Sequence, residues 1–199
     1  QARERDEKVI RMWRERDWPR IKKARRRRQS IVFIDESGFM LQPVRRRTWA
    51  PRGQTPIQKS WDRHDRLSAI SALTVPPCRR RLGLCFRIHS HNIRFGQVIE
   101  FLTLLHRRVR RRFILVIDRY SSHRKALRLL GEEHPGWFDV EWLPSYAPEL
   151  NPVEQVWNHS KYSDLANFIP DDIDHLHKEL ANSIRDQCSH LDLLRSFFK

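Results

Sequence analysis

Three acidic residues stand where a folded chain would bring their carboxylates to one place. Asp35 follows an apolar run of four residues, and Asp118 follows an apolar run of five. Glu154 comes just after Leu-Asn-Pro-Val, which is a helix-start signal. Two acids are therefore predicted to close strands and the third to open a helix.

These three acids suit a metal-dependent reaction on phosphate esters. Two like charges at adjacent strand ends repel each other unless a cation lies between them. A third carboxylate completes an all-oxygen site suited to Mg²⁺ or Mn²⁺. Two such ions, about 3.5–4 Å apart, can activate an attacking water or 3′-hydroxyl and stabilise the leaving oxygen. The acids together predict a two-metal site that cuts phosphodiester bonds, with Mg²⁺ as cofactor and Mn²⁺ as its substitute.

Each acid also has an ordinary structural interpretation. Asp35 could begin a turn, and Asp118 could cap the helix that follows it. Glu154 fits a plain helix start in which Asn151 is the N-cap. Glu36 is a weaker candidate, because its side chain should point to the strand face opposite that of Asp35. Only the combination of the three acids favours catalysis.

The chain is strongly basic, with 39 Lys and Arg against 24 Asp and Glu and a net charge of +15. That imbalance indicates a polyanionic partner, for which double-stranded DNA is the obvious candidate. Residues 1–30 hold 13 of the basic and five of the acidic residues, which predicts a basic arm. Runs of arginine, including one at 107–112, could grip phosphates or be solvated helix faces. The residues predicted to contact DNA are Arg25, Arg26, Arg27, Arg28, Arg45, Arg46, Arg47, Arg79, Arg80 and Arg81, with Trp49 either stacking on a base or packing in the core.

The cysteine pattern and the hydropathy indicate the cellular compartment of the protein. The three cysteines show neither a disulfide framework nor the C-x-x-C spacing of a zinc site. No apolar stretch approaches the ~18 residues of a membrane span, and the N-terminus lacks a signal core. We therefore expect a cytoplasmic protein with no membrane partner. Because the chain opens in a helix-favouring stretch without a start methionine, we also expect that an N-terminal portion of the natural protein is missing.

The patterns along the chain predict an arm over 1–29 and one α/β domain over 30–199. Within the arm, a helix at 2–17 should be interrupted at Pro19. An antiparallel meander followed by alternating helix and strand favours a mixed sheet with helices on both faces. Strands are predicted at 31–35, 45–50, 66–75, 80–88, 113–118 and 138–143, and helices at 92–110, 122–131, 152–163, 171–187 and 190–198.

Two of these strands, 31–35 and 113–118, are apolar up to the acid that ends each of them, as central strands buried on both faces should be. If they are parallel neighbours, Asp35 and Asp118 share the carboxyl edge of the sheet, with backbones about 4.8 Å apart. Open α/β sheets bind their ligands at that edge.

Four segments carry a pattern that is recognisable as a whole. They read IVFIDESGF at 31–39, RRTWAPRGQTPI at 46–57, LVIDRYSSHR at 115–124 and WLPSYAPELNPVEQVW at 142–157. The last segment is the most specific, and 35 residues separate Asp118 from Glu154. Over about residues 10–199 the pattern resembles the mariner-type DDE transposases, in particular the bacterial insertion-sequence-630 group.

The resemblance implies a ribonuclease-H-like fold, that is, a mixed five-stranded sheet flanked by helices, with Asp35, Asp118 and Glu154 as the metal-binding triad. It further implies cleavage of insertion-sequence DNA and strand transfer by a homodimer on DNA at the bacterial nucleoid. His123 and Asn151 fall on motif positions, and we interpret His123 as making a structural hydrogen bond. Nothing in residues 1–30 offers the family's helix-turn-helix region. The chain therefore looks like the catalytic part of a longer transposase.

Two other functions stay open at this point. One is a basic DNA-binding remnant of a transposase, in which the acids serve only as caps and turns. The other is a different ribonuclease-H-like nuclease, such as a junction resolvase or an enzyme that cuts RNA:DNA hybrids, against which the Asn-Pro-Val-Glu context argues by resemblance.

Overall fold

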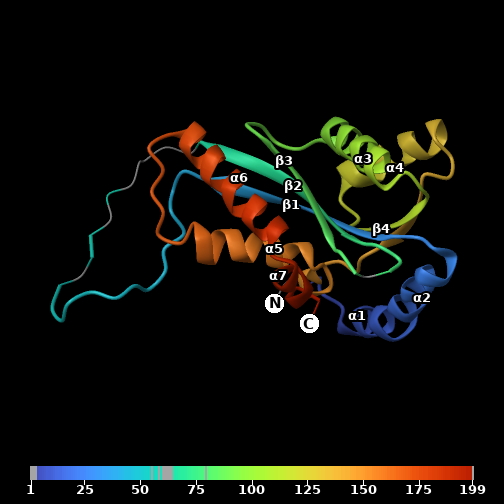
Figure 1. Cartoon of the computed structure of the whole chain (residues 1–199), viewed down its shortest axis with the longest axis horizontal. Helices are drawn as coiled ribbons and strands as arrows, with labels where there is room; N and C mark the ends of the chain where they lie inside the picture. The colour runs from blue at the N-terminus through green and yellow to red at the C-terminus, as the bar shows by residue number, and fades with distance from the viewer. Residues whose placement is uncertain (1–3, 55, 58, 60–64, 79, 199) are drawn as a thin grey trace.

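Five strands form one mixed sheet in the order β3-β2-β1-β4-β5 (Figure 1). The computed structural model describes residues 4–54, 56–57, 59, 65–78 and 80–198, so Arg79 lies outside the described residues, as does the side chain of Arg25. The strands are β1 (Ile31–Met40), β2 (Arg66–Val75), β3 (Gly83–His89), β4 (Phe113–Ile117) and β5 (Phe138–Trp142). The predicted mixed five-stranded sheet is confirmed.

Strand β1 lies at the centre and has two different neighbours. It pairs antiparallel with β2 along its whole length, and β2 pairs antiparallel with β3. With β4 it pairs parallel over three residues only, in the register Ile31↔Ile114 to Phe33↔Val116. Because β1 continues to Met40, Asp35 does not end its strand as predicted, and it lies just beyond the parallel pairing instead.

Helices cover both faces of the sheet. The N-terminal segment contains α1 (Glu7–Met12), the π-helix η1 (Trp13–Asp17), α2 (Trp18–Lys22) and the 3₁₀-helix η2 (Lys23–Arg27). The remaining helices are α3 (Phe95–Val109), α4 (Ser121–Glu133), the 3₁₀-helix η3 (Pro148–Leu150), α5 (Val153–His159), the π-helix η4 (Ser160–Asp164), α6 (Ile173–Ser189) and α7 (Leu191–Ser196).

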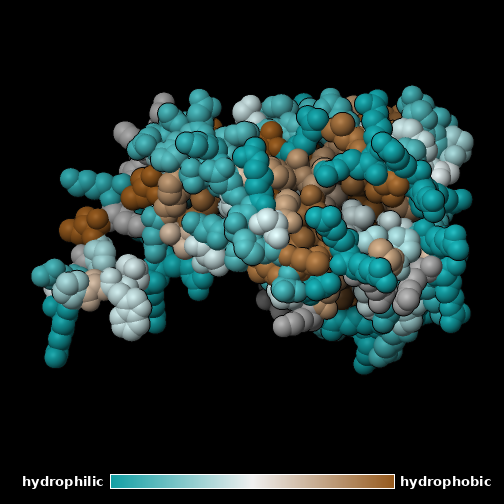
Figure 2. All heavy atoms as spheres, in the orientation of Figure 1, coloured by the Kyte–Doolittle hydropathy of each residue, from teal (hydrophilic) through white to brown (hydrophobic). Residues whose placement is uncertain are grey.

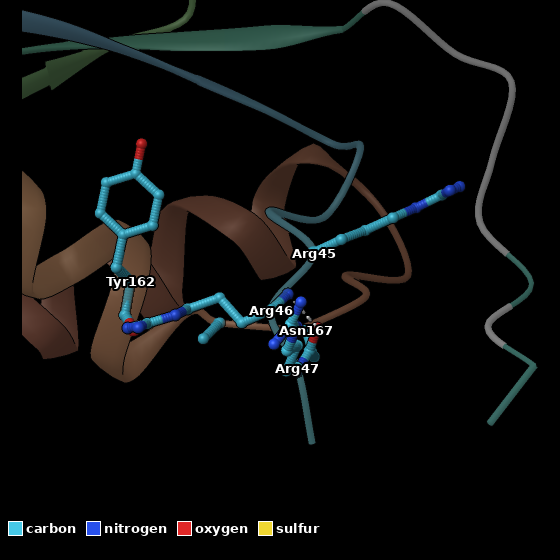
Figure 3. Close-up of a pocket in the computed structure, with 6 residues that line it drawn as sticks. Arg45, Arg46, Arg47, Tyr162 and Asn167 are labelled. Carbon is cyan, nitrogen blue, oxygen red and sulfur yellow. Dashed lines mark hydrogen bonds between the residues drawn. The ribbon is translucent and has the colours of Figure 1, made fainter. Parts of the chain in front are cut away.

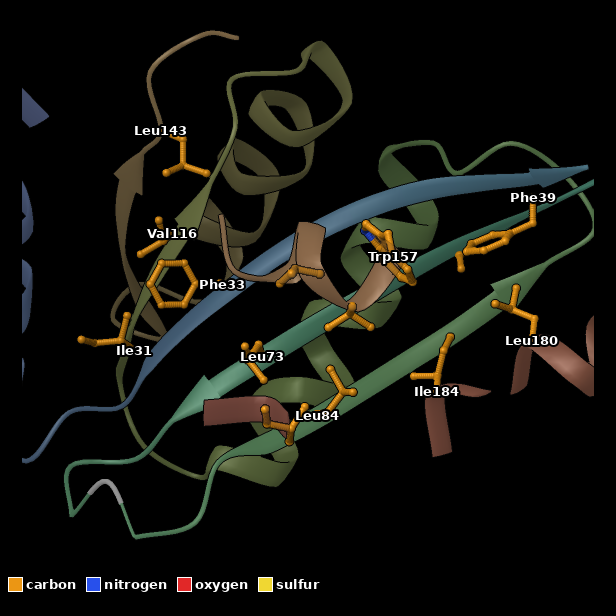
Figure 4. Packing of buried hydrophobic residues seen from close by; sticks show 14 of the residues in the cluster. Ile31, Phe33, Phe39, Leu73, Leu84, Val116, Leu143, Trp157, Leu180 and Ile184 are labelled. Carbon is orange, nitrogen blue, oxygen red and sulfur yellow. The ribbon is translucent and has the colours of Figure 1, made fainter. Parts of the chain in front are cut away.

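Alternation along the strands divides the core into two hydrophobic clusters. On β1, Ile31 and Phe33 pack into the cluster with α5, α6 and the N-terminal helices, whereas Val32 and Ile34 pack into the cluster with α3 and α4. Trp157 of α5 lies against the sheet in the first cluster, beside Phe39 (Figure 4). Burial on both faces explains why β1 begins with four consecutive apolar residues.

The predicted strand at 45–50 is wrong. Residues Arg45–Ala50 have no strand partner, and only the preceding Val44 makes an isolated bridge, to Ala166. β2 already pairs with one side of β1 through Met40, and the segment turns away from the sheet after β1 (Figure 1). Three successive arginines also leave the segment without an alternating apolar face.

The predicted interruption at Pro19 is also wrong. Helical structure continues from Glu7 to Arg27, and the turn just before Pro19 is the π-helix η1. A proline lacks the N–H for an i→i−4 bond and crowds the preceding turn, which the wider π turn accommodates. Trp13, Ile21 and Ala24 of this segment are buried in the first cluster.

Hydrophilic side chains cover much of the face shown in Figure 2, and hydrophobic atoms gather near its middle. The segment after β1 projects away from the sheet (Figure 1). Within the described part of the chain, no helix combines the length and the apolar character that a membrane crossing requires.

Candidate functional site

The alternation of side chains along each strand determines the sheet face to which Asp35 and Asp118 point. Asp35 continues the series Ile31, Phe33 on β1, and Asp118 continues the series Ile114, Val116 on β4, so both belong to the face that α5 covers. Extending the parallel register by two residues from Phe33↔Val116 sets Asp35 opposite Asp118. The structure therefore brings both aspartates to one edge of the parallel pair.

A cavity of about 430 Å³ lies at this edge and is lined by all three acids. Asn151 and the segment Leu143–Pro148 form part of its wall. We call the cavity with Asp35, Asp118 and Glu154 the acid site.

The helix that starts at the Asn-Pro-Val-Glu motif, α5, continues into the π-helix η4. Together they supply three side chains to this edge at helical spacing. Glu154, Trp157 and Lys161 are separated by three and four residues, which places them on one face of α5 and η4. The indole Nε1 of Trp157 donates a hydrogen bond to Asp35 Oδ2 at 2.9 Å. The ammonium of Lys161 donates to Ser37 Oγ at 2.7 Å. Our sequence analysis missed Trp157 and Lys161, although the spacing Glu-x-x-Trp-x-x-x-Lys could have revealed them.

Asn151 joins α5 to β1 next to Asp35. Its Nδ2 donates to the backbone oxygen of Ile34 at 2.9 Å, and its Oδ1 accepts from the backbone N–H of Val153 at 3.2 Å. Asn151 is 4% exposed, so both bonds are shielded from water. The N-cap of α5 is Pro152 and not Asn151 as predicted, but the Asn151 side chain still joins the start of the helix to the strand that carries Asp35.

The acid site holds more negative charge than its surroundings neutralise. Burial raises the pKa of Asp35 to about 8, and the charge of Glu154 adds to the rise, whereas the hydrogen bond from Trp157 opposes it. Burial also raises the pKa of Glu154, against the nearby charge of Lys161. Burial lowers the pKa of Lys161, which Glu154 and Asp35 partly offset. Without a further cation, Asp35 is thus protonated at neutral pH.

His123 links Asp118 to a fourth carboxylate. Its Nδ1 donates to Asp118 Oδ1 at 2.5 Å and its Nε2 donates to Glu36 Oε1 at 3.0 Å. Burial alone would lower the pKa of His123, but these two hydrogen bonds raise it to about 10. His123 in turn lowers the pKa of Asp118 against the effect of burial. Glu36 does face away from Asp35, as strand alternation predicts, and its partner is the α4 histidine.

The donor atoms of the acid site fit a hard divalent cation, because they are carboxylate oxygens. The hydrogen bonds described for Asp118 all involve Oδ1, namely those from His123 and from the backbone N–H of Tyr120. Among the residues that the structure describes, no group of three or more His, Cys, Asp or Glu is arranged to hold a metal as it stands. The acids line one cavity, and their side chains would have to turn towards a common ion.

The arginines that were predicted to contact DNA do not all lie in one place. Arg26 and Arg27 lie in η2 with Arg28 just after it, and Arg80 and Arg81 lie in the turn between β2 and β3. Arg45, Arg46 and Arg47 line a separate cavity of about 740 Å³ with Tyr162 and Asn167. Trp49 is fully exposed, which excludes core packing for this residue.

Within that separate cavity, Arg46 has a structural role of its own. Its guanidinium donates to the Tyr162 backbone oxygen at 2.5 Å, and its backbone N–H donates to Asn167 Oδ1 at 2.8 Å. Arg46 extends towards Tyr162 while Arg45 points away from it (Figure 3). Arg46 thus attaches the segment after β1 to η4.

The sheet order, with two aspartates on neighbouring central strands and an acid on the covering helix, defines a ribonuclease-H-like fold. Solved structures titled as mariner Mos1 complexes share it. The Mos1 mariner paired-end complex with Mn aligns with a TM-score of 0.67, 18% identity, and coverage of 98% of this chain and 60% of that chain. The Mos1 strand transfer complex aligns with a TM-score of 0.60, 17% identity, and coverage of 98% and 63%. The chain thus spans about three fifths of the length of the solved chains it matches.

The family follows from the sequence itself. The family model described as DDE superfamily endonuclease matches residues 30–177. This chain belongs to the DDE superfamily endonucleases, which confirms the predicted family. No curated protein sequence matches the chain significantly.

Proposed function

We propose that the chain is the catalytic part of a metal-dependent transposase, which cuts insertion-sequence DNA and joins the cut end to a second DNA. Asp35, Asp118 and Glu154 would be its metal ligands. The observation that carries this proposal is that acids from three separate elements line one cavity, where burial, with the charge of Glu154, raises the pKa of Asp35 to about 8. Family membership supports the same reaction class.

The proposed cofactor is a pair of Mg²⁺ ions, with Mn²⁺ as a substitute. When bound to carboxylates, such ions supply Lewis acidity at the phosphate and a hydroxide-like nucleophile at neutral pH. Mos1 complexes have been solved with Mn and with Mg, which supports the choice of metals.

The protein's own contribution is to hold the carboxylates in place. Trp157 fixes Asp35 Oδ2, and His123 fixes Asp118 Oδ1. Asn151 ties the start of α5 to β1, so Glu154 keeps its place relative to Asp35. A protonated Asp35 would have to release its proton when a cation enters, which makes occupancy of the site pH-dependent.

The partners we propose are double-stranded DNA, at both the element ends and the target, and a second copy of the chain on paired ends. Mos1 has been solved in paired-end and strand transfer complexes, which supports this assembly. We also propose that residues 1–29 act as a basic arm to a catalytic domain at 30–199, in the cytoplasm of a bacterium and close to its nucleoid.

Calorimetric titration with Mn²⁺ tests the metal site directly. We expect saturable binding by the wild type and its loss in Asp118→Asn, which removes one charged ligand without changing side-chain size. Asp192→Asn is the matched control, because Asp192 has a side chain 96% exposed and lies on α7 away from the cavity. Equal Mn²⁺ binding by wild type and Asp118→Asn would overturn the assignment.

Nicking of duplex DNA with Mn²⁺ tests the reaction. We expect Asp118→Asn to reduce nicking by on the order of 10³-fold or more, since a catalytic metal supplies several kcal/mol of transition-state stabilisation. DNA binding in EDTA should be nearly unchanged. If the wild type binds DNA but neither binds Mn²⁺ nor nicks, the non-catalytic remnant becomes the better description.

A further inference from the structure

A second charged pocket lies at the opposite edge of the same sheet. It has a volume of about 500 Å³ and is lined by Arg27, Arg28, Gln29, Arg111, Arg112 and Asp139. We call these residues the arginine pocket. Its arginines come from two segments about 80 residues apart in sequence, the end of η2 and the turn between α3 and β4, and Asp139 comes from β5.

The parallel pairing of β1 with β4 is what joins these segments. The pairing starts at Ile31↔Ile114, and the backbone N–H of Ile114 donates to the oxygen of Ser30 at 2.9 Å. Residues just before both strands must therefore meet at the edge where the strands begin. The Asp118 end of β4 lies about five strand residues away, roughly 16 Å at the usual rise. A phosphate in the arginine pocket is thus not the one at the acid site.

The pocket keeps most of its positive charge uncompensated. Arg112 forms an ion pair with Asp139, and Gln29 Nε2 donates to the same carboxylate at 3.1 Å. In the part of the chain that the structure describes, no carboxylate pairs with Arg27, Arg28 or Arg111. Four guanidinium groups against one carboxylate leave the pocket with a charge of +3. Such a cluster is self-repelling unless an anion is bound to it.

Two arginines near the pocket have a backbone conformation that is unfavourable for long side chains. Arg28 has φ 55° and Arg110, the C-cap of α3, has φ 57°. This left-handed conformation favours glycine or asparagine over residues with long side chains. Arginine at both turns therefore adds positive charge at the cost of backbone strain.

Further arginines lie along the same edge. β2 ends at Val75 opposite Ile31, and β3 begins at Gly83 opposite Thr74, so the turn with Arg80 and Arg81 is on this side of the sheet. Together, the pocket and this turn hold more guanidinium groups than a single phosphate can bind. A polymer of phosphates fits such an edge better than a single anion.

We infer that the arginine pocket binds the phosphate backbone of double-stranded DNA at phosphates other than the one at the acid site. This inference rests on the proposed function only for the choice of DNA as the polyanion. Arg27 and Arg111 are the predicted phosphate contacts. Arg112 already forms an ion pair with Asp139, so it is left unchanged in the test.

The test is the salt dependence of binding to a 40-base-pair duplex, measured by fluorescence anisotropy in EDTA. The variant is Arg27→Gln/Arg111→Gln, which removes two charges and keeps long polar side chains. The control is Arg128→Gln/Arg185→Gln, which gives the same net charge but changes exposed residues on α4 and α6. Circular dichroism would confirm that both variants are folded.

Loss of two phosphate contacts should lower the slope of log K against log salt by about 1.8, at about 0.9 for each contact. The control should keep the wild-type slope. Equal slopes for the two variants would overturn the inference, because net charge alone would then explain binding. Binding of inorganic phosphate to the wild type and the control but not to the variant, together with equal DNA slopes for the two variants, would show a small-anion site instead of a DNA contact. No metal takes part, so failure here is distinct from failure of the proposed catalysis.

Discussion

The acid site and the arginine pocket are built by the same device and handle charge in opposite ways. Both arise because β1 and β4 run parallel, which brings residues beyond the paired stretch to one edge and residues before it to the other. At the acid site, each aspartate is held by a specific donor, Trp157 for Asp35 and His123 for Asp118. In the arginine pocket only Arg112 is held by a carboxylate in the part of the chain described.

The contrast suits the two kinds of ligand that we propose. A compact divalent ion requires a few oxygens in fixed directions, so its ligands need anchors and low exposure. A DNA backbone offers many equivalent phosphates, and exposed arginines can meet them without fixed geometry. Anchored charge at one edge and unanchored charge at the other therefore predict large, specific effects of mutation at the acid site and small, salt-dependent effects at the pocket.

The largest effect is expected for Asp35→Asn, in two opposite directions. The variant should lose Mn²⁺ binding and yet be more stable than the wild type in EDTA at pH 9. Because the folded-state pKa of Asp35 is raised from 3.8 to about 8, the wild type loses stability as the pH rises through this window. Asn accepts the Trp157 hydrogen bond without the charge.

Urea unfolding at pH 5 and pH 9 checks this prediction. We expect a gain in stability of roughly 0.5–2 kcal/mol at pH 9, which is the usual size for a stabilising substitution, and little difference at pH 5. A variant that is less stable than the wild type at both values would show that Asp35 is not short of positive charge.

The next effect is expected for His123→Gln, which removes the cation between Asp118 and Glu36. Mn²⁺ affinity should fall by about 10–100-fold, as for other residues that orient metal ligands. His123 has its pKa raised from 6.5 to about 10, so its stabilising contribution is complete below 6.5 and is lost as the pH rises through 10. The stability difference between wild type and variant should shrink over that window. A constant difference from pH 6 to pH 10 would assign His123 to packing alone.

The features of the fold and site that depend on local sequence pattern could be predicted from the sequence. Strands that are apolar at every position indicated the two central strands, and parallel pairing then placed Asp35 and Asp118 on one edge. The sequence did not allow prediction of the His123–Glu36 contact, because the two residues are 87 positions apart and no pattern joins α4 to that face of β1. The arginines near position 110 were seen as basic, but their meeting with Arg27 depends on strand register and not on composition.

The wrong predictions at residues 45–50 and at Pro19 have the same origin. Residues 45–50 were predicted as a strand, yet β2 already pairs with β1 as far as Met40 and the segment after β1 projects away from the sheet. Pro19 is a local helix breaker, yet packing of Trp13 and Ile21 into the core keeps the segment helical through a π turn. In both cases tertiary pairing decided against the local preference.

A smaller effect is expected for Trp157→Phe, which removes the indole donor and keeps an aromatic ring in the core. Loss of one hydrogen bond to a carboxyl group should reduce stability by about 1–3 kcal/mol and raise the pKa of Asp35 further. Mn²⁺ titrations between pH 6 and pH 9 would show the shift as binding that requires higher pH. Trp18→Phe is the matched control, because Trp18 packs on the same face without contacting an acid.

The smallest effect at the acid site is expected from the arginine pocket itself. Arg27→Gln/Arg111→Gln should leave Mn²⁺ affinity within about twofold of the wild type, because charges roughly 16 Å apart are separated by more than a Debye length at 0.15 M salt. Combined with His123→Gln, the two changes should be additive in free energy, as independent distant sites are. Calorimetry on the single and combined variants measures this. Non-additive Mn²⁺ binding would show that the two ends of the strand pair are coupled, so that DNA at the arginine pocket could alter the metal site.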